Sequence, residues 1–196
     1  MTGEAAVRRA LRDRRSDEPT RLWLSRLLNT LSRVPSPSLV DDLADTLRGG
    51  LGDEHRHLED DPDAHLAFWR DVSARYPEVP RLRALYADTL LLTGHKEAAL
   101  DEFLAAFAAD PRLLYAFSGE LRDFFESRGG RAWALYRVVV IKAAELDDPQ
   151  THSGYINEQR EELMAVVRAN PDYAAAVLAV LRSPSGSPGT ERDAES

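Results

Sequence analysis

The residues best suited to chemistry gather in one polar stretch, 53–65, with the sequence DEHRHLEDDPDAH. It contains three imidazoles and several carboxylates, and the candidate metal ligands are His55, His57, His65, Asp60, Asp61 and Asp63. Such groups bind zinc and other divalent ions, yet His-x-His with a distant third histidine is neither the i, i+4 pair of a helical zinc site nor a familiar loop. A polar loop that leads into a capped helix accounts for the same residues. A metal-dependent enzyme or sensor that uses this loop is therefore the alternative hypothesis.

Other catalytic motifs are missing from the sequence. There is no cysteine, which excludes thiol nucleophiles and iron–sulfur ligation. The sequence also lacks a Gly-x-Ser-x-Gly elbow, a phosphate-binding Gly-x-x-x-x-Gly-Lys loop and a dinucleotide glycine pattern. His95 and His152 fall in predicted turns with no catalytic partner near them in the sequence. We therefore predict that the protein is not an enzyme and needs no cofactor.

Charge and hydropathy limit the kind of partner that the protein can bind and the cell compartment in which we expect it. The net charge of −8 disfavours nucleic acid, except at a local basic patch. One patch exists within residues 1–16, and its cations are Arg8, Arg9, Arg12, Arg14 and Arg15. It could dock on anionic lipid or nucleic acid, or it could be a solvated helix end. No apolar run is long enough to span a membrane, and no secretory signal is visible, so we expect a cytoplasmic protein with another protein as its partner.

Proline, glycine and short polar residues recur along the chain in the order expected at the starts and ends of successive helices. Apolar residues recur at three- and four-residue steps between these breaks. The segment YRVVVIKA, 136–143, is rich in β-branched residues, but its flanks favour helix and no partner strand is available. Gly49 is expected to end its helix in the left-handed conformation. The predicted helices cover 21–34, 38–50, 62–76, 80–92, 96–109, 111–128, 131–146, 155–169 and 173–182, which defines an all-α protein.

Composition divides the chain into three parts. Residues 1–16 form a basic N-terminal segment, and residues 17–182 form a single all-α helical-repeat domain. The last part, SPSGSPGTERDAES at 183–196, contains proline, glycine, serine and charge without an apolar anchor. We expect this tail to be disordered.

The stretch LLTGHKEAALDEFLAAFAADP, 91–111, combines two apolar helical runs with a glycine between them. We place Pro80 at the first position of a repeat of about 34 residues. Small residues then stand at Ala87, Ala99 and Ala106, an aromatic residue at Phe103, a turn glycine at Gly94 and a closing proline at Pro111. This pattern resembles the tetratricopeptide repeat. The resemblance implies antiparallel helical hairpins stacked as a short solenoid, with extra flanking helices.

Neighbouring segments match the repeat less well. The next hairpin offers Leu121, Phe125, Gly129, Ala134, Val138 and Ile141 at corresponding positions, but Arg122 stands where a small residue is usual. Upstream, residues 67–80 resemble the last helix of an earlier repeat. The resemblance covers about residues 62–148, and an irregular helical bundle is the other interpretation.

The family resemblance implies a protein–protein interaction or assembly module that binds a peptide or helix on its concave face. That face is lined by the first helix of each hairpin, which assigns partner binding to Arg81, Ala84, Asp88, Leu91, Tyr115, Ser118 and Arg122. Chaperone-binding members of the family use lysine and asparagine to clamp a carboxylate, whereas this chain has Ala84 and Asp88. That particular role is not expected.

Overall fold

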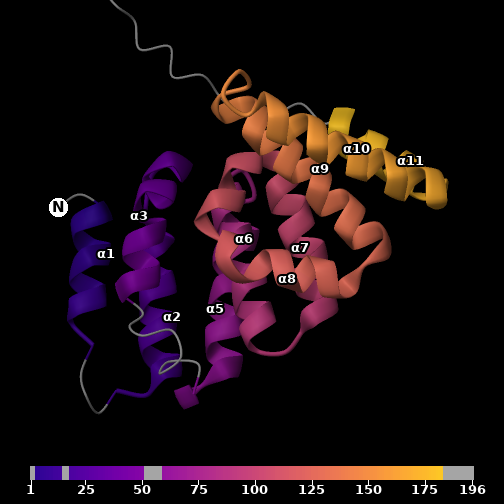
Figure 1. Ribbon diagram of the computed structural model, residues 1–196. Coiled ribbons are helices and arrows are strands. Elements are labelled where there is room, and N and C mark those ends of the chain that lie inside the picture. Colours follow the sequence, from indigo (N-terminus) through magenta and orange to yellow (C-terminus); the bar gives the residue numbers. More distant parts are fainter. Residues whose placement is uncertain (1–2, 15–17, 51–58, 183–196) are drawn as a thin grey trace, which may run out of the picture. The chain divides into compact units, whose positions relative to one another are not determined.

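The computed structural model describes residues 3–14, 18–50 and 59–182 (Figure 1). All regular structure in this part of the chain is helical, so the predicted all-α class is confirmed. The chain divides into two compact units, Met1–Ala105 and Ala106–Ser196, and the division falls inside one helix, α7 (Lys96–Ala109). Each unit is described separately below.

The N-terminal unit is an assembly of packed helices. Helix α1 (Gly3–Arg12) packs against both α2 (Thr20–Leu31) and α3 (Pro37–Gly50). Helix α5 (Pro62–Arg75) packs against α2 and, more extensively, against α6 (Pro80–Leu92). Helix α3 also contacts α6. The core of this unit includes Trp23, Leu27, Leu43, Val72 and Leu82.

Local chemistry explains where α5 begins. The Asp61 carboxylate accepts a hydrogen bond from the Ala64 amide at 3.0 Å, and Pro62 stands in the first turn, where its missing N–H costs nothing. Beyond the end of α5, the Tyr76 hydroxyl donates to the Leu31 carbonyl at 2.8 Å. That buried bond links the residue that follows α5 to the last residue of α2.

The turn between α6 and α7 has the geometry that its glycine predicts. Gly94 has a φ of 84°, and its amide donates to the Leu91 carbonyl at 3.1 Å. The His95 amide donates to the Leu90 carbonyl at 2.8 Å. These two bonds form a Schellman motif, which ends α6 and reverses the chain within a few residues. Beyond the turn, Arg83 of α6 forms an ion pair with Glu102 of α7 at 2.5 Å.

The C-terminal unit is built around α9 (Gly130–Asp147). This helix contacts the 3-10 helix η1 (Pro111–Ala116), α8 (Ser118–Arg128), α10 (Ser153–Ala169) and α11 (Tyr173–Arg182). The β-branched run 136–143 lies within α9, so the prediction that it is helical is confirmed, and its residues Val138, Val139 and Ala143 are completely buried. A helix surrounded by other helices buries most of its circumference, so its side chains need not alternate with polar ones. Lys142 Nζ donates to the Val180 carbonyl at 2.6 Å and so connects α9 to α11.

Two sequence-based boundaries are wrong. Residues 111–128 form η1 and α8 rather than one helix, because the backbone of Phe117 (φ −123°, ψ 12°) leaves helical geometry between them. Helix α3 runs through Gly49 to Gly50, and the described glycines with positive φ are Gly94, Gly129 and Gly130. Gly49 therefore does not act as a left-handed stop.

Candidate functional site

The predicted binding residues of the N-terminal unit lie on the side of α6 that α3 contacts. Arg81 forms an ion pair with Asp45 of α3 at 3.0 Å, and Asp88 forms one with Arg48 of α3 at 3.3 Å. Ala84 has no exposed surface. Leu91 is partly buried. A partner could not reach the buried Ala84, and the charges of Arg81 and Asp88 already interact with α3.

The predicted residues of the C-terminal unit differ in their surroundings. Tyr115 lies in η1 and is 53% exposed. Ser118 is the first residue of α8, and its side chain lies outside the described part of the structure. Arg122 is exposed and borders a pocket that α9 and α10 complete. The structure therefore joins one predicted residue, Arg122, to a set of side chains that the sequence analysis did not identify.

This pocket has a volume of about 260 Å³. Its lining side chains are Arg122 from α8, Trp133, Tyr136, Arg137 and Val140 from α9, and Tyr155, Glu158, Gln159 and Glu162 from α10. The contributions from α9 and from α10 each follow the spacing i, i+3, i+4, i+7, so one face of each helix lines the pocket. Both faces can be read from the sequence, but their pairing depends on how α8, α9 and α10 pack.

Stacked aromatic rings form the pocket wall on α9. Phe125 stacks on Tyr136 with ring centroids 4.9 Å apart, and Tyr136 stacks on Trp133 at 5.4 Å. The Arg137 guanidinium lies 4.5 Å from the Trp133 ring centroid and continues the stack as a cation–π contact. The stack holds the Tyr136 ring between two neighbours, which restricts its orientation.

Arg137 is the buried cation of the pocket. Its side chain is 13% exposed, and its Nη1 atom donates to Gln159 Oε1 at 2.9 Å and pairs with Glu162. Among the described residues, the buried Nε atom of Arg137 has no hydrogen-bond partner. The charges of Arg137 and Glu162 thus offset each other within the pocket wall.

Tyr136 places a neutral hydroxyl at the pocket. Burial raises the pKa of Tyr136, and Tyr155 raises it further, while Arg122 acts in the opposite direction. The phenol therefore remains protonated at neutral pH and can donate a hydrogen bond. Within the described part of the chain, the hydroxyls of Tyr136 and Tyr155 have no hydrogen-bond partner, and Arg122 and Glu158 have no ion-pair partner.

Of the three histidines in the alternative metal hypothesis, the structure describes only His65. His55 and His57 lie outside the described residues. His65 is 2% exposed in α5, and its Nε2 atom accepts a hydrogen bond from Trp69 Nε1 at 3.1 Å. That contact uses one of the two ring nitrogens that could bind a metal. The described residues contain no group of three or more histidine, aspartate or glutamate side chains arranged to hold a metal ion.

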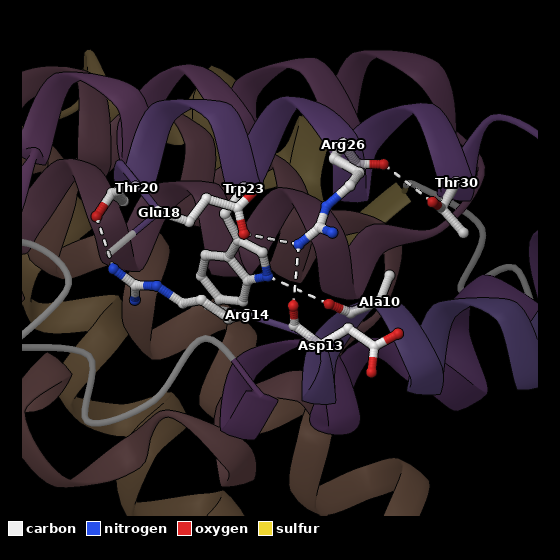
Figure 2. Close-up of polar contacts among 8 residues, drawn as sticks. All are labelled: Ala10, Asp13, Arg14, Glu18, Thr20, Trp23, Arg26 and Thr30. Carbon is white, nitrogen blue, oxygen red and sulfur yellow. Dashed lines mark hydrogen bonds and ion pairs between the residues drawn. The ribbon is translucent and has the colours of Figure 1, made fainter. Parts of the chain in front are cut away.

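The basic N-terminal segment contains a packed helix and internally bonded arginines. In α1, Val7 is completely buried, and Trp23 Nε1 donates to the Ala10 carbonyl at 3.2 Å (Figure 2). The Arg14 guanidinium lies 4.8 Å from the Trp23 ring centroid and donates to the Thr20 hydroxyl at 3.0 Å. Arg8 pairs with Glu4 at 2.7 Å. Arg9 and Arg12 are exposed, and Arg15 lies outside the described residues.

Comparison with known proteins identifies no relative of this chain. No protein-family model, curated protein or solved structure matches the chain. No described helix is both long and apolar enough to cross a membrane.

Proposed function

We propose that this protein is a helical-hairpin interaction module of tetratricopeptide-like type, which binds a peptide or helix of a partner protein. The α6–α7 hairpin is the observation that carries the proposal. Ala87 and Ala99 are both completely buried, one on each helix, and Gly94 makes the tight turn between them. Small buried residues on both helices allow the close helix crossing on which such repeats depend.

The next hairpin supports the same proposal. Helices α8 and α9 pack together across a turn in which Gly129 and Gly130 have φ values of 59° and 49°. Leu121 and Phe125 of α8 are buried, as are Ala134 and Val138 of α9. Their burial agrees with the positions that the repeat assigns to packing. Stacking of the two hairpins into a solenoid is part of the proposal.

Partner contact is best placed on the C-terminal unit. A partner that bound the charges of Arg81 and Asp88 would have to compete with α3, because both residues pair with that helix. Tyr115 and Arg122 are exposed, and neither forms an ion pair or hydrogen bond with the described residues. An aromatic residue and an arginine are also the side chains most enriched at binding hot spots.

Site-specific photo-crosslinking in a native lysate tests this placement. A photoreactive phenylalanine at Tyr115 should capture a discrete partner, and Arg122→Glu in the same chain should reduce the yield of that adduct. The same photoreactive residue at Leu22, which is 61% exposed in α2, is the matched control. Equal adducts from both positions, or an adduct indifferent to Arg122→Glu, would contradict the proposed surface.

The metal-dependent alternative makes a different prediction. If the histidine loop binds a metal, protein purified without a histidine tag should contain stoichiometric zinc, iron or manganese. A variant with His55→Ala and His57→Ala should then lose it. Our proposal expects no such metal, and elemental analysis of the two proteins separates the hypotheses.

A further inference from the structure

We infer that the pocket among α8, α9 and α10 binds a small amphoteric molecule with the size and charges of a free α-amino acid. The site is defined by Arg122, Tyr136, Tyr155 and Glu158, supported by the Arg137–Glu162 pair. This inference adds a small-molecule site to the proposed protein-binding function and does not depend on it. Size, charge and unused hydrogen-bonding groups each support it.

The volume of the pocket limits the ligand. At about 260 Å³ it lies just below the range of roughly 300–1,000 Å³ that is usual for drug-sized ligands. An amino acid is smaller than such ligands. A folded partner element would instead need a longer groove.

The charges of the pocket favour a ligand that carries both signs. Arg137 and Glu162 pair with each other, which leaves Arg122 and Glu158 as the cation and anion without an ion-pair partner in the described structure. A simple anion would be attracted by Arg122 and repelled by Glu158. A simple cation would be attracted by Glu158 and repelled by Arg122. A ligand that carries both a carboxylate and an ammonium group avoids this conflict, because each residue then faces a group of opposite charge.

The tyrosines supply the directional contacts. Tyr136 is 6% exposed, and its hydroxyl has no hydrogen-bond partner among the described residues, so it is available to a ligand. The stack with Phe125 and Trp133 holds its ring in place without a ligand. We assign Tyr136, together with the Tyr155 hydroxyl and Arg122, to the ligand carboxylate, and Glu158 to the ligand ammonium group.

The test begins with the full chain and the standard free amino acids at about 10 mM, scored by thermal shift and followed by calorimetry. At least one should bind. Two derivatives of that amino acid then remove one charge each: the decarboxylated amine and the N-acetyl acid. Each should bind at least about tenfold more weakly than the parent, because one half of the charge pair is lost.

Matched variants assign the binding to this pocket. Arg122→Gln and Glu158→Gln should each weaken binding at least about tenfold, and Tyr136→Phe about fivefold to tenfold. Arg168→Gln and Glu161→Gln make the same chemical changes at exposed positions of α10 outside the pocket and should leave affinity unchanged. Arg122 and Glu158 are exposed, so their loss should not prevent folding.

Three results would overturn the inference. One is that no amino acid shifts the unfolding temperature or gives heat of binding. The second is that the parent and both single-charge derivatives bind equally well. The third is that binding requires a peptide containing adjacent acidic and basic residues and is not seen with any free amino acid, which would assign the pocket to a partner protein.

Discussion

At the scale of single residues, the fold proposal depends on two alanines. Ala87 and Ala99 are completely buried in α6 and α7, whereas Ala98 is exposed. Neighbouring positions in one helix point about 100° apart, which explains how adjacent alanines meet such different surroundings. Their contrast allows the hairpin register to be tested without knowledge of any partner.

We predict that Ala99→Leu destabilises the protein by about 1–3 kcal/mol, because it forces extra methylene groups into a close contact. Ala98→Leu makes the same change in the same helix, so intrinsic helix propensity is matched, and its leucine can remain in solvent. The free energies of unfolding of both variants, measured in urea, provide the check. If Ala98→Leu cost as much as Ala99→Leu, the proposed crossing would be wrong.

At the scale of elements, α3 is attached to α6 by two ion pairs in which the acidic and basic residues are exchanged between the helices. In one the acid belongs to α3 (Asp45–Arg81), and in the other it belongs to α6 (Arg48–Asp88). Reciprocal charges favour one register of the two helices, because sliding α3 along α6 would separate both pairs. The residues expected to bind a partner thus contact a helix of the same chain.

A charge swap measures that contact. Arg81→Asp should destabilise the protein by up to about 1 kcal/mol, because it places two acids together at a partly exposed site. Adding Asp45→Arg should restore most of the loss, since the pair is then reversed. A double-mutant cycle in urea at low and high salt gives the coupling energy, which should be smaller at high salt. Strictly additive single effects would show that the pair does not hold α3 in place.

At the scale of the whole molecule, buried tyrosines link stability to alkaline pH. The pKa of Tyr76 is raised chiefly by burial, and so is that of Tyr136, from the ordinary value of 10.0. The folded state therefore favours the neutral phenol. This contribution to stability is fully present at pH values below the pKa of tyrosine in the unfolded chain. It is lost as pH rises through the higher pKa of the same tyrosines in the folded state.

We accordingly expect the urea midpoint of unfolding to fall between about pH 9 and pH 11. Tyr136→Phe should flatten this dependence, because phenylalanine cannot ionise. A midpoint that rises over this interval, or a Tyr136→Phe profile identical to that of the unchanged protein, would contradict the assignment to buried phenols.

The helices from α2 onward, and most of their ends, could be predicted from the sequence, whereas α1 was not among the predicted helices. Asp61 caps α5, and Gly94 reverses the chain after α6, because caps and turns depend on residues only a few positions apart. The helix-forming flanks and the lack of a partner strand also identified α9 as a helix despite its β-branched run. The break at Phe117 was missed, although the Ser118-Gly119 dipeptide that follows it is of a kind that marks turns.

The pairing of helix faces could not be predicted from the sequence. Nothing near Arg81 in the sequence indicates that Asp45 will pair with it, and nothing near Arg122 indicates that α10 will complete its pocket. Likewise, His65 stands in a polar, metal-like stretch but is buried against Trp69. Periodicity shows that a helix has an apolar face, but the choice of partner depends on contacts between residues far apart in the chain, for which the local pattern carries no signal.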